Sequence, residues 1–166
     1  MLRYIKMNNN FYNKNIEESI IIGEAKYKDS KKISEIHESR FPKPYGINYI
    51  KLLIKNDINL ILVAKKEKKI IAFMVIQKVL DVSEIITIAV EKNYEGSGIC
   101  HKLILDAIDR LKKLNVKFIT LEVSNTNLRA LNLYSKNNFK KKSLRKNYYT
   151  DQFGEKTDAY LYERKL

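Results

Sequence analysis

One strand–loop–helix segment constrains the fold more than any other part of the chain. It begins with Ile85–Val90, a run that is apolar except for one threonine and is typical of a strand buried on both faces of a sheet. A short loop with Gly96 and Gly98 follows, and Ser97–Leu114 then repeats apolar residues at helical spacing opposite Lys, Asp and Arg. This order predicts an α/β unit packed around a buried sheet.

The flanking segments extend this unit in both directions. Segments that we expect to be strands lie at Ser19–Ala25, Asn59–Lys65, Lys69–Leu80, Ser83–Val90, Val116–Val123, Phe139–Tyr148 and Thr157–Lys165. Helical patterns lie at Lys28–Ser39, Ile47–Lys55, Ser97–Leu114 and Asn127–Asn137. The order β-α-α-β-β-β-α-β-α-β-β predicts one α/β domain with a mixed sheet over residues 19–166. Residues 1–18 are polar and weakly periodic, which predicts a flexible N-terminal extension.

Length and composition exclude several classes of protein. The chain has 166 residues, which fits one domain with its own core. No apolar run approaches the roughly 20 residues of a membrane span, and the N-terminus lacks the apolar core of a secretory signal. One cysteine and two histidines argue against a disulfide framework and a metal site. We therefore expect a cytoplasmic protein without a metal, as a monomer or weak dimer.

The net charge of +13 has two interpretations. It is an electrostatic footprint for RNA or another anionic ligand, or it reflects a coding bias towards Lys, Ile and Asn. The lysines are spread over most segments and far outnumber the arginines, whereas nucleic-acid surfaces more often show Arg clusters with interleaved aromatic residues. We favour the coding bias and expect no direct binding to nucleic acid.

The loop with Gly96 and Gly98 is the first candidate for ligand binding. Successive backbone N–H groups at the start of a helix form an anion cradle, and glycines allow close approach of a ligand. Glycines in such turns also occur for purely conformational reasons, so this segment alone leaves both interpretations open. No Gly-Lys-Ser/Thr sequence follows, which excludes a Walker loop.

The second half of the chain resembles a GNAT acetyltransferase, and specifically the bacterial RimI group, which acetylates protein N-termini. The resemblance lies in VLD at Val79–Asp81, IAV at Ile88–Val90, YEGSGICHKLI at Tyr94–Ile104, LEVSNTN at Leu121–Asn127, ALNLYSKNNF at Ala130–Phe139, RKNYY at Arg145–Tyr149 and DA at Asp158–Ala159. The spacing between these blocks is the specific part. The resemblance implies the GNAT fold and acetyl-CoA as co-substrate.

The resemblance also implies roles for single residues. It assigns acetyl-CoA binding to Ile88, Ala89, Val90, Gly96, Ser97, Gly98, Ile99, Cys100, His101 and Asn127. Glu122 takes the place of the general base and Tyr134 that of the general acid, while Phe41, Tyr45, Arg145, Asn147 and Tyr148 fall in regions that line the acceptor groove. These roles suit the chemistry: an N-terminal amine has a pKa of about 7.7–8 and attacks only when neutral, so a carboxylate must take its proton. A phenol beside the sulfur protonates the departing thiolate.

Each of these residues also has a structural interpretation. Glu122 fits an exposed strand edge, and Tyr134 fits a core tyrosine with a solvated hydroxyl. Asn127 fits the cap of the helix that begins there. His37 is expected to be packed, and Cys100 to be an inert small residue.

Two departures from the family pattern bear on function. The usual loop, Gln/Arg-x-x-Gly-x-Gly/Ala, keeps only Gly98. Glu95 puts a negative charge near the pyrophosphate, and Cys100 adds a side chain where the backbone should approach closely. We expect weaker CoA binding without its loss. Pro42–Tyr45 replaces a segment that often holds Trp, so the acceptor is less firmly implied than the chemistry.

The leading hypothesis is an acetyl-CoA-dependent N-acetyltransferase that acts on a protein N-terminus, with small-subunit ribosomal protein eighteen as the implied acceptor. A second hypothesis is a GNAT enzyme for another amine, such as a lysine, a polyamine or a small molecule. A third is a non-catalytic basic binding module that predicts salt-dependent RNA binding without turnover.

Overall fold

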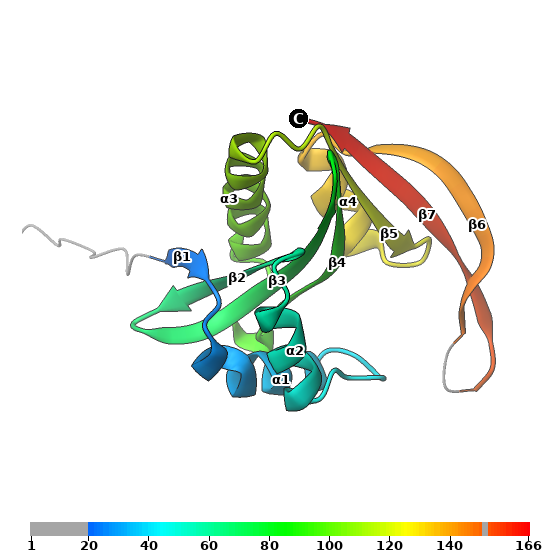
Figure 1. Cartoon of the computed structure of the whole chain (residues 1–166). Helices are drawn as coiled ribbons and strands as arrows, with labels where there is room; N and C mark the ends of the chain where they lie inside the picture. The colour runs from blue at the N-terminus through cyan, green and yellow to red at the C-terminus, as the bar shows by residue number, and fades with distance from the viewer. Residues whose placement is uncertain (1–19, 151–152) are drawn as a thin grey trace, which may run out of the picture.

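A seven-stranded mixed sheet runs through the computed structural model, which describes residues 20–150 and 153–166 (Figure 1). Its strands are β1 (Ile21–Glu24), β2 (Asn59–Lys66), β3 (Lys69–Val79), β4 (Val82–Val90), β5 (Phe118–Ser124), β6 (Lys140–Thr150) and β7 (Lys156–Lys165). They lie side by side in the order β1-β2-β3-β4-β5-β7-β6, and only β4 and β5 pair in parallel. The predicted extension 1–18 falls outside the described residues.

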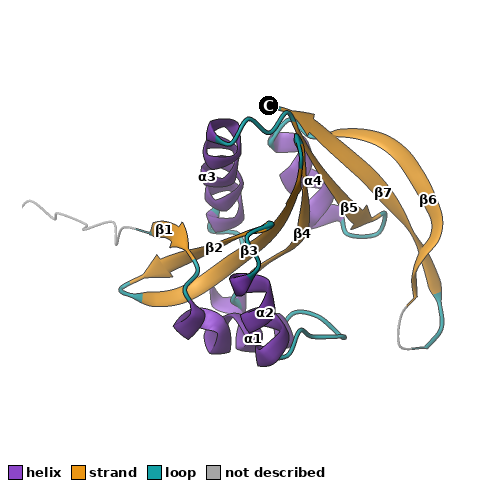
Figure 2. Cartoon of the chain, in the orientation of Figure 1, coloured by secondary structure: helices purple, strands orange, loops and turns teal. Residues whose placement is uncertain are grey.

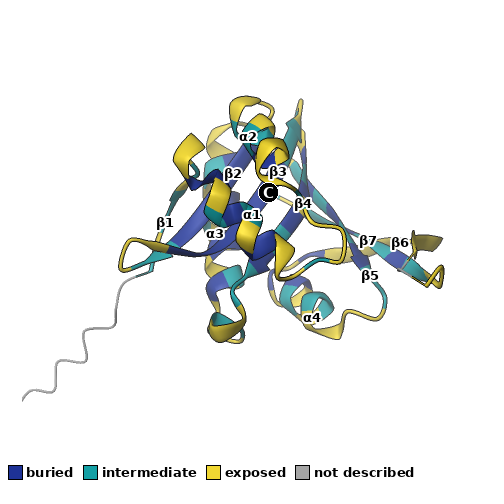
Figure 3. Ribbon diagram, turned by 90° about the horizontal axis from the view of Figure 1, so that it is seen from below, coloured by how far each residue is buried: buried dark blue, intermediate teal, exposed yellow. Residues whose placement is uncertain are grey.

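The helices cover both faces of the sheet (Figure 2). They are α1 (Ser30–Glu38), α2 (Ile47–Lys55), α3 (Ile99–Lys113) and α4 (Leu128–Lys136), with short 3-10 turns at Tyr27–Asp29 and Lys92–Tyr94. On one face, Ile33, Ile36 and Ile50 of α1 and α2 pack against Phe73 of β3. On the other, α3 buries an apolar stripe against β2–β5. Figure 3 shows buried residues along the central strands of the sheet. Burial of these two stripes is the main stabilising contribution.

The sheet opens between its two halves. The pairing of β4 with β5 ends at Ile85 and Leu121, and beyond this point the two strands diverge (Figure 1). A β-bulge contributes, because Ile85 and Thr87 of β4 lie opposite the consecutive residues Ile76 and Val75 of β3, which leaves Ile86 as an extra residue. The outer end of β4 therefore faces an opening.

The predicted order of elements is confirmed, with bounds shifted by one or two residues at most ends. Asn115 (φ 59°) ends the α3 segment and Asn138 (φ 60°) the α4 segment, as expected of a residue that tolerates the left-handed conformation. The expectation that β4 is buried on both faces is wrong. Ile86 is 39% exposed and Ile88 is half-buried, because β5 has left the side of β4 at this point. No helix in the described ranges is both long and apolar enough to span a bilayer.

Candidate functional site

A pocket of about 760 Å³ opens where β4 and β5 part. Its wall comes from the end of β4, the start of α3, α4 and the segment after α1. The lining residues include Arg40, Phe41, Ile88, Ala89, Val90, Glu95, Gly96, Gly98, Ile99, Cys100, His101, Asn127, Arg129 and Tyr134. The structure thus brings together nine of the ten residues expected to bind acetyl-CoA; the tenth, Ser97, lies between two lining glycines. Among the residues described, no cluster of His, Cys, Asp or Glu is arranged to hold a metal ion.

The loop that opens α3 directs the helix start towards this pocket. Gly96 (φ 75°) and Gly98 (φ 79°) both adopt the left-handed conformation, and a Cβ on either would meet no atom within 4 Å. The glycines are therefore required by backbone geometry, not by lack of space. Gly98 precedes the first turn of α3, whose N–H groups and positive dipole end suit an anion. His101 is fixed behind the loop by a 2.8 Å contact between its Nδ1 and Oδ1 of Asn137.

Cys100 is a pocket residue without nucleophilic character. Burial, assisted by the charge of Glu95, raises the pKa of its thiol to about 11. The thiol is therefore protonated at neutral pH, and a thiol is a much weaker nucleophile than a thiolate. This agrees with its interpretation as an inert small residue.

Asn127 combines two of the interpretations drawn from the sequence. Its Oδ1 accepts a hydrogen bond of 3.1 Å from the N–H of Ala130, which caps α4, and the residue also lines the pocket. The cap fixes the side chain at the pocket edge.

Tyr134 lies on the pocket wall. The residue is 6% exposed, and its ring packs edge-to-face against Phe139 with centroids 5.7 Å apart. Burial raises the pKa of its phenol, and the neighbouring Cys100 and Tyr149 add to the effect. The hydroxyl is therefore protonated throughout the neutral range.

Glu122 lies one residue beyond the last β4–β5 pair, at the point of divergence. Its side chain is 10% exposed, and Oε1 is 2.6 Å from Nη1 of Arg145. A hydrogen bond to Glu122 raises the pKa of Tyr148. Burial, followed by the charge of Glu122, raises the pKa of Tyr149 to about 12. Glu122 does not line the pocket itself; Tyr149 lies close enough to interact with both Glu122 and Tyr134.

The residues expected to line the acceptor groove fall into two groups. The first group, Arg145, Asn147 and Tyr148, lies on β6. Arg145 and Tyr148 both interact with Glu122, while Asn147 adopts φ 54° and donates its N–H to Oδ1 of Asp158 at 2.9 Å. Phe41 and Tyr45 lie on the α1–α2 segment, where both stack on the ring of His37 at 4.2 Å. His37 is buried, as expected, and its Nδ1 accepts the N–H of Tyr45.

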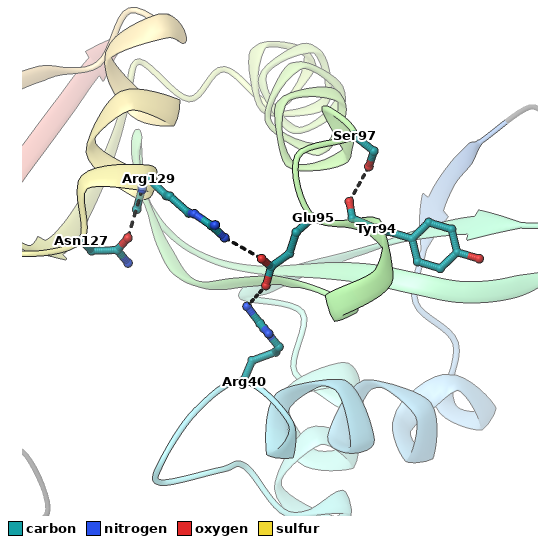
Figure 4. Close-up of polar contacts among 7 residues, drawn as sticks. Arg40, Tyr94, Glu95, Ser97, Asn127 and Arg129 are labelled. Carbon is teal, nitrogen blue, oxygen red and sulfur yellow. Dashed lines mark hydrogen bonds and ion pairs between the residues drawn. The ribbon is translucent and has the colours of Figure 1, made fainter.

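Four further residues at the site were missed in the sequence. Glu84 lies opposite Thr120, on the same face as Glu122, and burial with the charge of Glu122 raises its pKa. Tyr149 follows Tyr148 in the quoted RKNYY block, so its place was visible but its role was not. Arg40 and Arg129 both pair with Glu95 from distant elements, a contact that no local pattern encodes (Figure 4).

Comparison with known proteins identifies the fold family. The model of the acetyltransferase (GNAT) family matches residues 30–139. The chain belongs to the GNAT acetyltransferase family. The matched range includes Glu122 and Tyr134, whereas Arg145 and Tyr148 lie beyond its end.

Individual relatives and solved structures agree with the GNAT assignment. The chain is 31% identical over 146 residues to the [ribosomal protein bS18]-alanine N-acetyltransferase of Haemophilus influenzae, which covers 85% of this chain and 95% of that protein. It is 36% identical over 93 residues to the Escherichia coli K12 enzyme of the same name, covering 56% of this chain and only 62% of the relative. The crystal structure of the ribosomal-protein-S18-alanine N-acetyltransferase from Escherichia coli superposes with a TM-score of 0.82 at 26% identity, covering 89% of this chain and 94% of that one. Arabidopsis thaliana NAA60 in complex with acetyl-CoA shares the fold at 19% identity, with a TM-score of 0.81 and coverage of 89% and 99%.

Proposed function

We propose that the protein transfers an acetyl group from acetyl-CoA to the α-amine of a protein N-terminus, with the terminal alanine of small-subunit ribosomal protein S18 as acceptor. The observation that carries this proposal is the arrangement at the opening of the sheet. The phenol of Tyr134 lies on the pocket wall, the carboxylate of Glu122 pairs with Arg145 of the β6–β7 hairpin, and Tyr149 interacts with both Tyr134 and Glu122. The names of the relatives at 31% and 36% identity support the choice of acceptor.

The pocket fits acetyl-CoA in size and in the nature of its walls. A volume of about 760 Å³ lies in the usual range for a small-molecule site. Ile88 and Val90 give it an apolar wall for the pantetheine arm, and the N-terminus of α3 faces the phosphates. When bound, acetyl-CoA supplies the activated acetyl thioester, and the protein holds it in line with the amine.

The acceptor end is built for a cationic amine. Glu84 and Glu122 project from the same face of β4 and β5, and Arg145 neutralises part of their charge. We propose that Glu122 accepts the proton that the ammonium must lose before it attacks, directly or through a water molecule. Tyr148 and Arg145 would then hold the carboxylate in place.

The leaving-group end is assigned to Tyr134. Because burial disfavours its tyrosinate, the phenol keeps its proton and donates a hydrogen bond to the sulfur as negative charge develops there. If the thiolate takes the phenol proton as the C–N bond forms and the C–S bond breaks, the newly acetylated nitrogen releases its second surplus proton and restores the Tyr134 phenol. Tyr149, which interacts with both residues, offers a hydroxyl through which that second proton can pass.

The test is intact-mass spectrometry of ribosomal proteins incubated with the protein and acetyl-CoA. The proposal predicts a gain of one acetyl group on one N-terminus, strongly reduced in Glu122→Gln. Glu24→Gln is the matched control, because Glu24 is also paired, with Arg110 at 3.0 Å, but lies on the edge strand β1, three strands away from β4. Transfer only to lysine side chains or polyamines would contradict the α-amine assignment.

A further inference from the structure

Three charged side chains from distant parts of the sequence meet at the rim of the pocket. Glu95 precedes α3, Arg40 follows α1, and Arg129 lies in the first turn of α4. Oε1 of Glu95 pairs with Nη2 of Arg40, and Oε2 lies 2.6 Å from Nη1 of Arg129 (Figure 4). One carboxylate thus binds two guanidinium groups that approach from different elements.

The other charges along the pocket wall indicate a role for the cluster of Arg40, Glu95 and Arg129. Arg40, Arg129 and Lys136 are the cationic lining residues, and Glu95 is the one carboxylate among the residues that line the pocket. The rim therefore attracts an anion, and the single negative side chain occupies the two arginines that such an anion would reach. The sequence predicted a carboxylate facing the ligand phosphates; the structure shows it paired on both oxygens.

We propose that Arg40 and Arg129 recognise a phosphate group of the ligand and that Glu95 competes with this phosphate for both guanidinium groups. The inference rests on the proposed function, since it takes the ligand to be a CoA thioester. Guanidinium groups bind carboxylate and phosphate through the same planar N–H geometry, so one can replace the other.

The burial of the three side chains favours such an exchange. The side chain of Glu95 is 25% exposed and that of Arg129 is 86% exposed, so the carboxylate can turn to solvent when a phosphate takes its place. An exposed ion pair contributes little by itself, whereas a phosphate carries more charge and more acceptor oxygens than a carboxylate. Glu95 therefore lowers the affinity for phosphate-bearing ligands without blocking the pocket.

The experiment compares ligands that differ in their phosphates. Isothermal titration calorimetry would measure the Kd of CoA, dephospho-CoA, 4′-phosphopantetheine and pantetheine for the wild type, Glu95→Gln, Arg40→Gln and Arg129→Gln. Glu91→Gln is the matched control. Glu91 lies four residues before Glu95 in the chain and is also paired, with Lys32 at 2.5 Å, but it does not line the pocket. The phosphate that the arginines recognise is the one whose removal abolishes the differences between variants.

The expected result is CoA binding about 5- to 10-fold tighter in Glu95→Gln and about 10-fold weaker in each arginine variant, the scale of one charge-assisted contact. Pantetheine affinity should not change in any of them, nor CoA affinity in Glu91→Gln. Weaker or unchanged CoA binding in Glu95→Gln would overturn the proposal, because Glu95 would then position the arginines or be irrelevant to them. So would an equal shift for pantetheine.

The result also separates this inference from the proposed function. If the variants shift as expected but the wild type acetylates no amine, the phosphate site stands and the transferase proposal fails. If the wild type binds none of the four ligands, both fail. A second variant, Glu95→Ala, should shift the CoA affinity in the same direction as Glu95→Gln.

Discussion

The two ends of the site each contain a carboxylate paired with arginine, yet the two pairs are built differently. Glu122, at the proposed acceptor end, has a side chain that is 10% exposed and pairs with Arg145 from the neighbouring hairpin. Glu95, at the proposed phosphate end, has a side chain that is 25% exposed and bridges two arginines. The same residue types can therefore serve opposite purposes: at one end the arginine holds a carboxylate in place, and at the other the carboxylate occupies arginines.

This comparison implies that Glu122 and Glu95 affect different measurable quantities, the turnover rate and the affinity for the ligand. A group that takes a proton during reaction affects kcat, whereas a group that competes with a bound phosphate affects ligand affinity.

Glu122→Gln should lower kcat about 10²- to 10³-fold, the range attributed to a general base. The amide has the shape of the carboxylate but does not take the proton. The Kd of CoA, measured by calorimetry, should stay within twofold of the wild type, because Glu122 does not line the pocket. If Glu122→Gln weakened CoA binding as much as it slowed turnover, the two ends of the site would not be separable.

Tyr134→Phe should lower kcat by about 10- to 100-fold, since it removes one hydrogen-bond donor to the departing sulfur. The ring packing on Phe139 is preserved, so the thermal midpoint should change little. Single-turnover kinetics with saturating acetyl-CoA would measure the effect, and Tyr160→Phe on β7 provides a control tyrosine that lies outside the pocket lining. An unchanged rate in Tyr134→Phe would leave the sulfur without an assigned donor.

Much of the fold was predictable because its signals are local. The amphipathic pattern of α3 gave its core face, and Asn115 and Asn138 marked helix ends through backbone preference alone. The divergence of β4 from β5 was not predictable in this way. The divergence depends on a bulge at Ile86 and on the pairing of β5 with β7. Neither feature produces a periodic pattern of apolar residues in the sequence.

The site shows the same division. Its loop residues from Gly96 to His101 were predictable because they are adjacent in the chain. The pairing of Glu95 with Arg40 and Arg129 joins positions 55 and 34 residues apart and depends on how α1 and α4 approach the loop. Glu84 looked like a polar residue at the start of a strand, and only the strand register places it beside Glu122.

The stability of the fold should depend on pH through His37. Burial lowers the pKa of His37 to about 4, and its ring stacks on Phe41, next to Arg40. Because the folded state releases this proton, stability should be complete above the unfolded pKa of 6.5 and should fall as pH drops from 6.5 towards 4.

Urea unfolding at pH 7, 6, 5 and 4 would measure this decline. The His37→Gln variant should be less stable at pH 7, by about 1–2 kcal/mol for a lost buried contact, but should show a shallower slope between pH 6.5 and 4. Equal slopes in the two proteins would assign the acid sensitivity to other groups. Loss of CoA affinity over the same range would connect His37 to the position of Arg40.

The smallest effect is expected from Glu84, the second carboxylate on the face that carries Glu122. Burial and the charge of Glu122 raise its pKa, so its contribution to stability is present below its ordinary pKa of 4.5 and is lost as pH rises through the higher folded value. At pH 7 the ionised carboxylate therefore opposes folding, and Glu84→Gln should stabilise the protein by about 0.5 kcal/mol, with no gain at pH 4. Glu38→Gln, an exposed carboxylate at the end of α1, is the control for a general loss of negative charge. Because Arg145 interacts with both Glu84 and Glu122, removal of Glu84 leaves its positive charge to Glu122 alone. A stabilised Glu84→Gln with reduced turnover would mean that the second carboxylate serves the amine at the expense of stability, a role with no counterpart at the phosphate end.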